Sequence, residues 1–115
     1  MPVKHLRFGK GFSVALSNRR GQAATMVIAP GDREGGPDNR HRGADQWLYV
    51  LSGRMRLVLG SHDLVLGPGE VAEFDTQTAH WLGNAGGEPT EVLSLFGRQG
   101  ERMHVRAEPR QDPGD

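Results

Sequence analysis

Histidine is the residue type in this sequence that is best suited to bind a metal ion, because imidazole nitrogens coordinate Mn, Fe, Ni and Zn. The chain has five histidines. His5, His62 and His104 lie at a terminus, beside a turn and near the C-terminal tail, where solvated side chains are common. His41 and His80 lie further inside the sequence. His5, His62 and His104 are therefore not expected to bind a metal ion.

Composition excludes several other classes of site. Cysteine is absent, which rules out a disulfide scaffold, thiolate zinc and iron–sulfur clusters. Fourteen Lys and Arg balance fourteen Asp and Glu, so no basic excess favours a nucleic acid. No run of 18 apolar residues occurs, and no apolar stretch follows the basic N-terminus. We therefore expect a cytoplasmic protein that binds neither nucleic acid nor membrane.

The elements that must position these histidines are predicted to be strands. The 115 residues fit one domain, assigned to residues 1–105, with a loosely ordered tail over residues 106–115. Seventeen Gly and seven Pro separate short apolar runs, and none of these runs has helical periodicity. The runs are 12–16, 23–29, 47–51, 55–59, 64–66, 71–74 and 92–96. This pattern predicts an all-β sandwich or barrel of about eight to ten short strands.

Some local features can be assigned more closely. Residues 54–59 alternate between outward and buried side chains, and residues 62–66 return as the partner strand of a hairpin. Gly31 to Arg40 is polar and Gly-rich, which predicts an internal loop. Trp47 to Leu51 is apolar on both faces, so its outer face needs a cover. A second copy of the chain would supply that cover, and we expect a homodimer.

Residues 35–53 resemble the first motif of the cupin superfamily, in which two histidines one residue apart precede a glutamate and a glycine follows after six more residues. Counting back from the closing glycine places Gln46 at the glutamate, His41 at the second histidine and Asn39 at the first. In an alternative alignment His41 is the first histidine and Gly43 the second. Under either alignment one histidine of the pair and the carboxylate are missing.

Residues 69–84 resemble the second cupin motif, which follows in the expected order. His80 and Asn84 match its histidine and asparagine, whereas Asp75 and Gln77 replace the Pro and Gly of its turn. With the flanking strands the resemblance covers most of the chain. It implies a double-stranded β-helix, a small jelly-roll barrel with a metal or ligand site in its mouth.

The resemblance also implies the ligands. They would be His41, His80 and Gln46, with Asn39 as a weak fourth ligand or a gap for water, around one divalent ion of Mn, Fe, Ni or Zn. Residues two apart in a strand share a face, so Asn39 and His41 could point into the barrel together. Because these side chains are neutral, the ion would keep its full charge and be held weakly, so its occupancy could be partial.

Two functions of different class stay open at this point. One is a small metal-dependent enzyme, an oxygenase, isomerase or lyase acting on a compact organic substrate. The other is a metal-free or degenerate cupin that binds a small ligand or acts in regulation. No further residue can be identified as a general base, and one barrel hosts many chemistries, so the sequence identifies neither substrate nor reaction.

Overall fold

The computed structural model describes residues 2–35 and 44–98, and these residues form strands and connections without any helix. None of them therefore forms a helix that could span a membrane. The nine strands of the described residues are β1 (Gly11–Asn18), β2 (Gly21–Ile28), β3 (Arg33–Gly35), β4 (Ala44–Ser52), β5 (Met55–Leu59), β6 (His62–Leu66), β7 (Val71–Asp75), β8 (His80–Asn84) and β9 (Thr90–Arg98). The predicted all-β class is confirmed.

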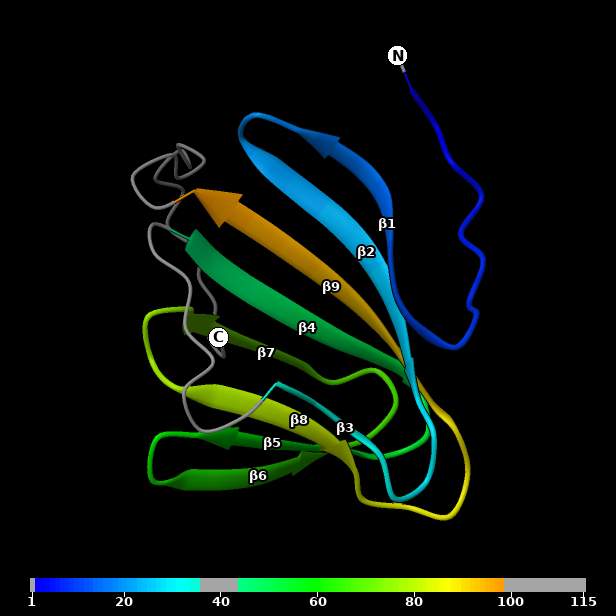
Figure 1. Ribbon diagram of the computed structural model, residues 1–115, viewed down its shortest axis with the longest axis vertical. Coiled ribbons are helices and arrows are strands. Elements are labelled where there is room, and N and C mark those ends of the chain that lie inside the picture. The colour runs from blue at the N-terminus through cyan, green and yellow to red at the C-terminus, as the bar shows by residue number, and fades with distance from the viewer. Residues whose placement is uncertain (1, 36–43, 99–115) are drawn as a thin grey trace, which may run out of the picture.

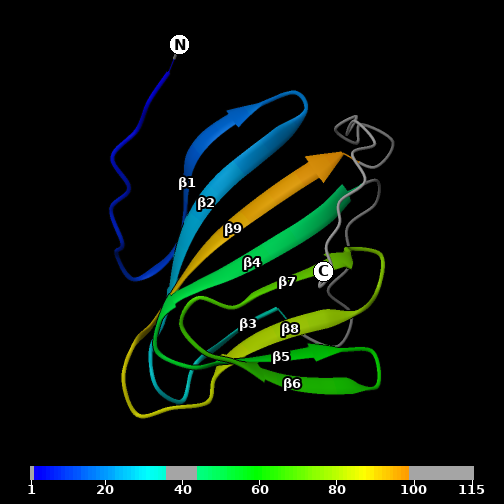
Figure 2. The same ribbon diagram turned by 180° about the vertical axis from the view of Figure 1, so that it is seen from behind.

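The strands form two antiparallel sheets that face each other. One sheet has five strands in the order β1-β2-β9-β4-β7, and the other has four in the order β3-β8-β5-β6. The sheets converge at one end of the strands and diverge at the end where β4 and β8 begin (Figures 1 and 2). This architecture is the double-stranded β-helix that the motifs imply. Its open end receives the first residues of β4 and β8.

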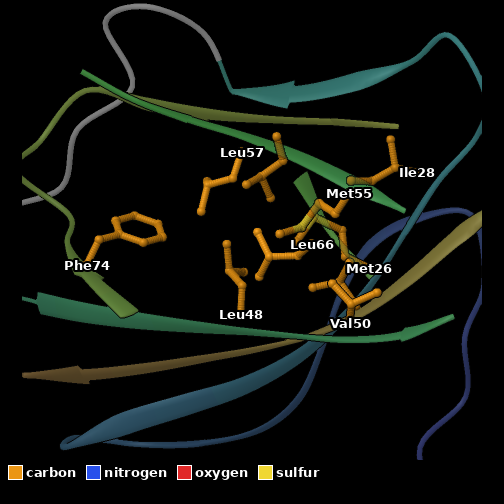
Figure 3. Packing of buried hydrophobic residues seen from close by; sticks show 10 residues of the cluster. Met26, Ile28, Leu48, Val50, Met55, Leu57, Leu66 and Phe74 are labelled. Carbon is orange, nitrogen blue, oxygen red and sulfur yellow. The ribbon is translucent and has the colours of Figure 1, made fainter. Parts of the chain in front are cut away.

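The core lies between the sheets and explains the alternation seen in the sequence. On β5, Met55 and Leu57 are fully buried while Arg56 between them is exposed. Side chains from both sheets interdigitate in this layer (Figure 3). Its buried members are Met26, Ile28, Leu48, Val50, Met55, Leu57, Leu66, Phe74, Leu82 and Val92. The apolar core therefore fills the body of the barrel and leaves polar inward positions near the open end.

The structure corrects one prediction. Part of the expected loop from Gly31 to Arg40 is a strand, because Arg33–Gly35 pairs antiparallel with β8. This strand lies at a sheet edge and pairs partly with glycine, so its pairing requires no apolar alternation that the sequence could reveal. The rest of that segment, and the tail over residues 106–115, lie outside the described residues.

Gly53 closes the first motif for a steric reason. It turns the chain between β4 and β5 with a φ of 84°. A Cβ atom there would lie 2.6 Å from Thr90 Oγ1 and 2.7 Å from Thr90 Cα. The Thr90 hydroxyl in turn accepts a hydrogen bond from the Arg54 amide. Only glycine fits this turn without moving the start of β9.

Candidate functional site

Gln46 places an amide inside the barrel near its open end. It lies on β4 on the same face as Leu48 and Val50, and its side chain is only 4% exposed. Its Nε2 donates a hydrogen bond of 2.9 Å to Ser94 Oγ on β9. Its Oε1 is buried and has no hydrogen-bond partner in the described part of the chain. A buried acceptor without a partner costs about 1–3 kcal/mol, so a bound cation or donor would satisfy it.

His80 places an imidazole in the same interior. It is the first residue of β8 and is 3% exposed. Its Nδ1 lies 2.8 Å from the carbonyl oxygen of Thr78. A carbonyl oxygen only accepts, so Nδ1 carries a proton, and in the neutral form of the ring Nε2 would carry the lone pair. This is the arrangement by which a backbone carbonyl orients a histidine toward a metal ion.

Phe74 neighbours Gln46 through strand pairing and His80 through a ring contact. It stands directly opposite Gln46 in the pairing of β7 with β4. Its ring centroid is 4.9 Å from that of His80, with 56° between the planes. His80 belongs to the four-stranded sheet and Gln46 to the five-stranded sheet. The imidazole and the amide therefore enter the interior from opposite sheets, with one aromatic ring next to both of their positions.

The turn before β8 explains how the altered second motif still positions His80. Asp75 Oδ1 accepts a 2.8 Å hydrogen bond from the Gln77 amide, and the Asp75 carbonyl accepts one of 2.9 Å from the Thr78 amide. A side-chain cap of this kind builds a tight turn without Pro or Gly. The turn presents the Thr78 carbonyl to the imidazole. A hydrogen bond between the Asp75 side chain and the Gln77 amide thus stabilises this turn in place of the usual Pro and Gly.

The motif residue Asn84 has a structural role at the far end of β8. Its Nδ2 donates to the carbonyls of Ile28 and Glu88, at 2.8 and 2.7 Å. Its Oδ1 accepts a 2.7 Å hydrogen bond from the Gly86 amide. The bonds with Glu88 and Gly86 hold the loop between β8 and β9, and the bond to Ile28 joins this end of β8 to the end of β2. Asn84 is therefore no part of the site around His80.

The remaining predicted ligands are not described. His41, Asn39 and Gly43 lie outside the described residues, so neither motif alignment is tested. Asp45 is buried on the face of β4 opposite Gln46. Over residues 2–35 and 44–98, no three His, Cys, Asp or Glu side chains gather as a metal cluster. Among the described residues, the candidate metal-ligating atoms are one imidazole nitrogen and one amide oxygen.

Ser94 and Phe74 belong to the site although sequence reasoning missed both. Ser94 is fully buried and follows Val92 on the inward face of β9. A hydroxyl at an inward position next to apolar neighbours was the available signal. Phe74 gave no such signal, because a buried aromatic in an apolar run is typical of ordinary core. What links them to Gln46 is strand pairing, which joins segments far apart in sequence.

The donor set suits a divalent ion or a polar ligand. In both Gln46 and His80, the protein holds one polar atom of the side chain, and Gln46 Oε1 is a buried acceptor without a partner in the described residues. When a protein group holds one polar atom of a metal-ligating side chain, it fixes the direction of the other polar atom and reduces the cost of binding the metal. Neither side chain is a carboxylate, so this part of the site adds no negative charge to whatever binds there.

Comparison with known proteins gives one family. A family model described as a cupin domain matches residues 24–96. Among curated proteins no match was found. The matched residues run from β2 to β9 and include Gln46, His80 and Ser94.

Solved structures share the fold at low sequence identity. A protein of Thermus thermophilus is 21% identical, with a TM-score of 0.74, over 85% of this chain and 98% of that one. An uncharacterized conserved protein with a double-stranded β-helix domain from Klebsiella pneumoniae is 20% identical, with a TM-score of 0.70, over 84% of each chain. A predicted oxalate decarboxylase from Thermotoga maritima is 23% identical, with a TM-score of 0.69, over 76% of this chain and 78% of that one. These likenesses concern the fold.

Proposed function

The chain belongs to the cupin superfamily, and from that premise we propose that the mouth of its barrel binds a divalent metal ion and acts on a small organic molecule. His80 Nε2 and Gln46 Oε1 would be the ligating atoms among the described residues. His41 and Asn39 are the sequence's candidates for the remaining positions. The observation that carries the proposal is the buried Gln46 oxygen, which lacks a hydrogen-bond partner within the described residues.

The chain's own residues would orient the ligands and keep water out. Ser94 holds the Gln46 amide so that its oxygen faces the interior, and the Thr78 carbonyl holds the His80 ring. Phe74 gives the site an apolar wall. A bound metal would supply Lewis acidity toward a substrate oxygen. Because the side chains are neutral, the positive charge of the ion stays available to an anionic substrate.

A small carboxylate is the substrate class that this charge balance favours. A dication held by neutral ligands attracts an anion more strongly than one already neutralised by a carboxylate ligand. The likeness to a predicted oxalate decarboxylase points in the same direction. The reaction would be of oxygenase, isomerase or lyase type. A fold shared at this level of identity leaves the choice among these to experiment.

Calorimetric titration with Mn²⁺, Fe²⁺, Ni²⁺ and Zn²⁺ tests the proposal. The wild type should bind at least one of these ions with one site per chain. His80→Ala should weaken binding at least about tenfold, because an imidazole supplies much of the affinity in a site without carboxylates. His62→Ala is the matched control: His62 is exposed on β6, so this variant should bind as the wild type does. Equal binding by His80→Ala would refute the proposed site.

One observation favours a second function. Gln46 stands where the cupin motif has a carboxylate, and a barrel that binds a small molecule without metal has no need of that charge. In that case the Gln46 oxygen would accept a hydrogen bond from the ligand itself. Metal analysis of untagged protein, followed by titration with small carboxylates with and without a chelator, separates the two. Carboxylate binding that a chelator leaves unchanged would support the metal-free barrel.

A further inference from the structure

Two arginine side chains contact one tryptophan on the outer face of the four-stranded sheet. The guanidinium carbon of Arg33 on β3 lies 4.6 Å from the centroid of the Trp81 ring on β8, and that of Arg56 on β5 lies 5.0 Å from it. In the sheet, β8 lies between β3 and β5, so the two guanidinium groups reach the indole from opposite neighbouring strands. Trp81 points away from the barrel, because the side chain of His80 before it points inward.

Gly83 provides the space that the indole occupies. It pairs with Arg33 on one side and with Arg56 on the other, so these three residues form one row across the sheet. Gly83 is buried although it belongs to this outer row. A Cβ atom at Gly83 would lie 3.1 Å from Trp81 Cζ3, so the ring itself covers the glycine. The indole therefore lies over Gly83, between the two arginines.

The two guanidinium groups differ in what else they contact. Arg56 donates through Nε and Nη2 to the two carboxylate oxygens of Asp63, at 2.9 and 2.6 Å. Its Nη1 group lies outside that pair. Arg33 is exposed, and no carboxylate of residues 2–35 and 44–98 forms an ion pair with it. Because a guanidinium has five N–H donors, this cluster keeps donors that a ligand could use.

The cluster has a net positive charge. In the two neighbouring outer rows that contain Arg33 and Trp81, the ionisable side chains are Arg33, Arg56 and Asp63. Two positive charges therefore face one negative charge, in a chain whose formal net charge is zero. Contact with the indole favours both cations and fixes the planes of their guanidinium groups. Arginines held in this way lose less freedom when they bind an anion.

We propose that Arg33, Arg56 and Trp81 form a second binding site, outside the barrel, for the phosphate group of a small phosphomonoester. The forked donors of a guanidinium match the oxygen atoms of a phosphate, and a dianion interacts with both positive charges at once. Arg33 would bind the phosphate through its unpaired donors, and Arg56 through Nη1 while Asp63 holds the other side of its fork. Trp81 would keep both guanidinium groups in position.

Titration with glycerol phosphate, followed by calorimetry and by tryptophan fluorescence, tests the site. The protein is first stripped of metal with a chelator and then freed of the chelator, so that no ion in the barrel can bind the phosphate. Trp47→Phe leaves Trp81 as the only tryptophan of the chain, so its emission reports on this site. The emission should change and saturate. Acetate, a monoanion, should bind at least about fivefold more weakly. An absence of saturable phosphate binding would overturn the proposal.

Removal of the exposed arginine tests which residues bind the phosphate. Arg33→Ala should weaken binding at least about fivefold, because it removes a positive charge and a fork of donors. Arg7→Ala is the matched control: Arg7 is an exposed arginine in the segment beside β2 of the other sheet, so this variant should bind as the wild type does. Thermal unfolding shows that each variant is folded. Equal binding by a folded Arg33→Ala variant would contradict the site.

Two further variants distinguish this site from general attraction of anions. Gly83→Ala keeps every charge but brings a Cβ atom against the indole, so phosphate binding should weaken as Trp81 moves. Asp63→Asn removes the negative charge beside Arg56 and should strengthen binding. A folded Gly83→Ala variant that binds as the wild type does, or an Asp63→Asn variant that binds more weakly, would refute the arrangement. These titrations contain no metal, so their outcome is independent of the proposed metal site.

Discussion

At the scale of single residues, Gln46 is the side chain on which the proposed site depends most. The motif resemblance predicts its position at the family's glutamate, and with it the loss of charge that a glutamine brings. Its hydrogen bond to Ser94 was not visible, because the two residues lie 48 apart in the chain and meet only through the pairing of β4 with β9. The structure therefore adds the direction in which the amide points.

Gln46→Glu should strengthen metal binding and weaken the metal-free fold. A carboxylate adds a negative charge to a neutral ligand set, so affinity for Mn²⁺ or Zn²⁺ should rise. Without metal the same charge is buried beside apolar side chains, which should cost about 2–4 kcal/mol at neutral pH and less in acid, where the carboxyl is protonated. Calorimetric titration and thermal unfolding with and without metal measure the two effects. A variant that binds metal more weakly than the wild type would contradict this assignment.

Ser94→Ala should lower both stability and metal affinity. The change removes the acceptor of the Gln46 Nε2 hydrogen bond, which leaves a second buried polar atom without a partner. The expected loss is about 1–3 kcal/mol in the free energy of unfolding. Metal affinity should fall as well, because the amide loses the group that orients it. Ser13→Ala, at an exposed position on β1, is the control and should behave as the wild type in both measurements.

At the scale of elements, apolar runs in the sequence predicted most of the strands. The strands whose sequences contain no apolar run were missed. The run 55–59 and its hairpin partner 62–66 appear in the structure with the same bounds. β3 and β8 were missed because Arg33–Gly35 is polar and because β8 contains His80, Gly83 and Asn84. The strand that carries the site histidine is thus one that its own composition conceals.

Gly53→Ala should destabilise the fold by about 3 kcal/mol or more, because a Cβ atom would collide with Thr90 and the backbone has a positive φ. Gly31→Ala is the matched control. Gly31 has a similar φ of 86° but nothing within 4 Å of its Cβ position, so that change should cost about 1–2 kcal/mol. Chemical denaturation measures both. Equal losses would show that the collision with the start of β9 is relieved by movement.

The hairpin of β5 and β6 carries an exposed ion pair with a defined pH response. Arg56 donates two hydrogen bonds to Asp63, of 2.9 and 2.6 Å, and these bonds hold the pKa of the Asp63 carboxyl below its usual value of 3.8. A carboxyl whose pKa is lowered by folding stabilises the fold at any pH above its pKa in the unfolded chain. This contribution is lost as the pH falls through its pKa in the folded protein. Asp63→Asn should therefore lower the melting temperature slightly at neutral pH. The difference should vanish in strong acid and shrink at high salt.

At the scale of the whole molecule, the sequence predicted the barrel but left the surroundings of its mouth open. Paired motif spacings and regular turn residues indicated a double-stranded β-helix, and the two sheets and the cupin family model confirm it. Strand pairing then decides which side chains share the interior, and no single segment of sequence contains that information. The exposed outer face follows the same rule. Trp47 to Leu51 indicated an apolar outer face, and strand pairing places Tyr49 of this segment opposite Val71 of β7.

The most direct test of the central claim is a Zn²⁺ titration of isotope-labelled protein followed by nuclear magnetic resonance. The proposed site predicts that the His80 ring Nε2 and the Gln46 side-chain amide shift together and saturate at one equivalent of zinc. The Asn84 side-chain amide, held by backbone carbonyls at the far end of β8, should stay in place. Saturable zinc binding that leaves both the His80 ring and the Gln46 amide unchanged would contradict the proposed site.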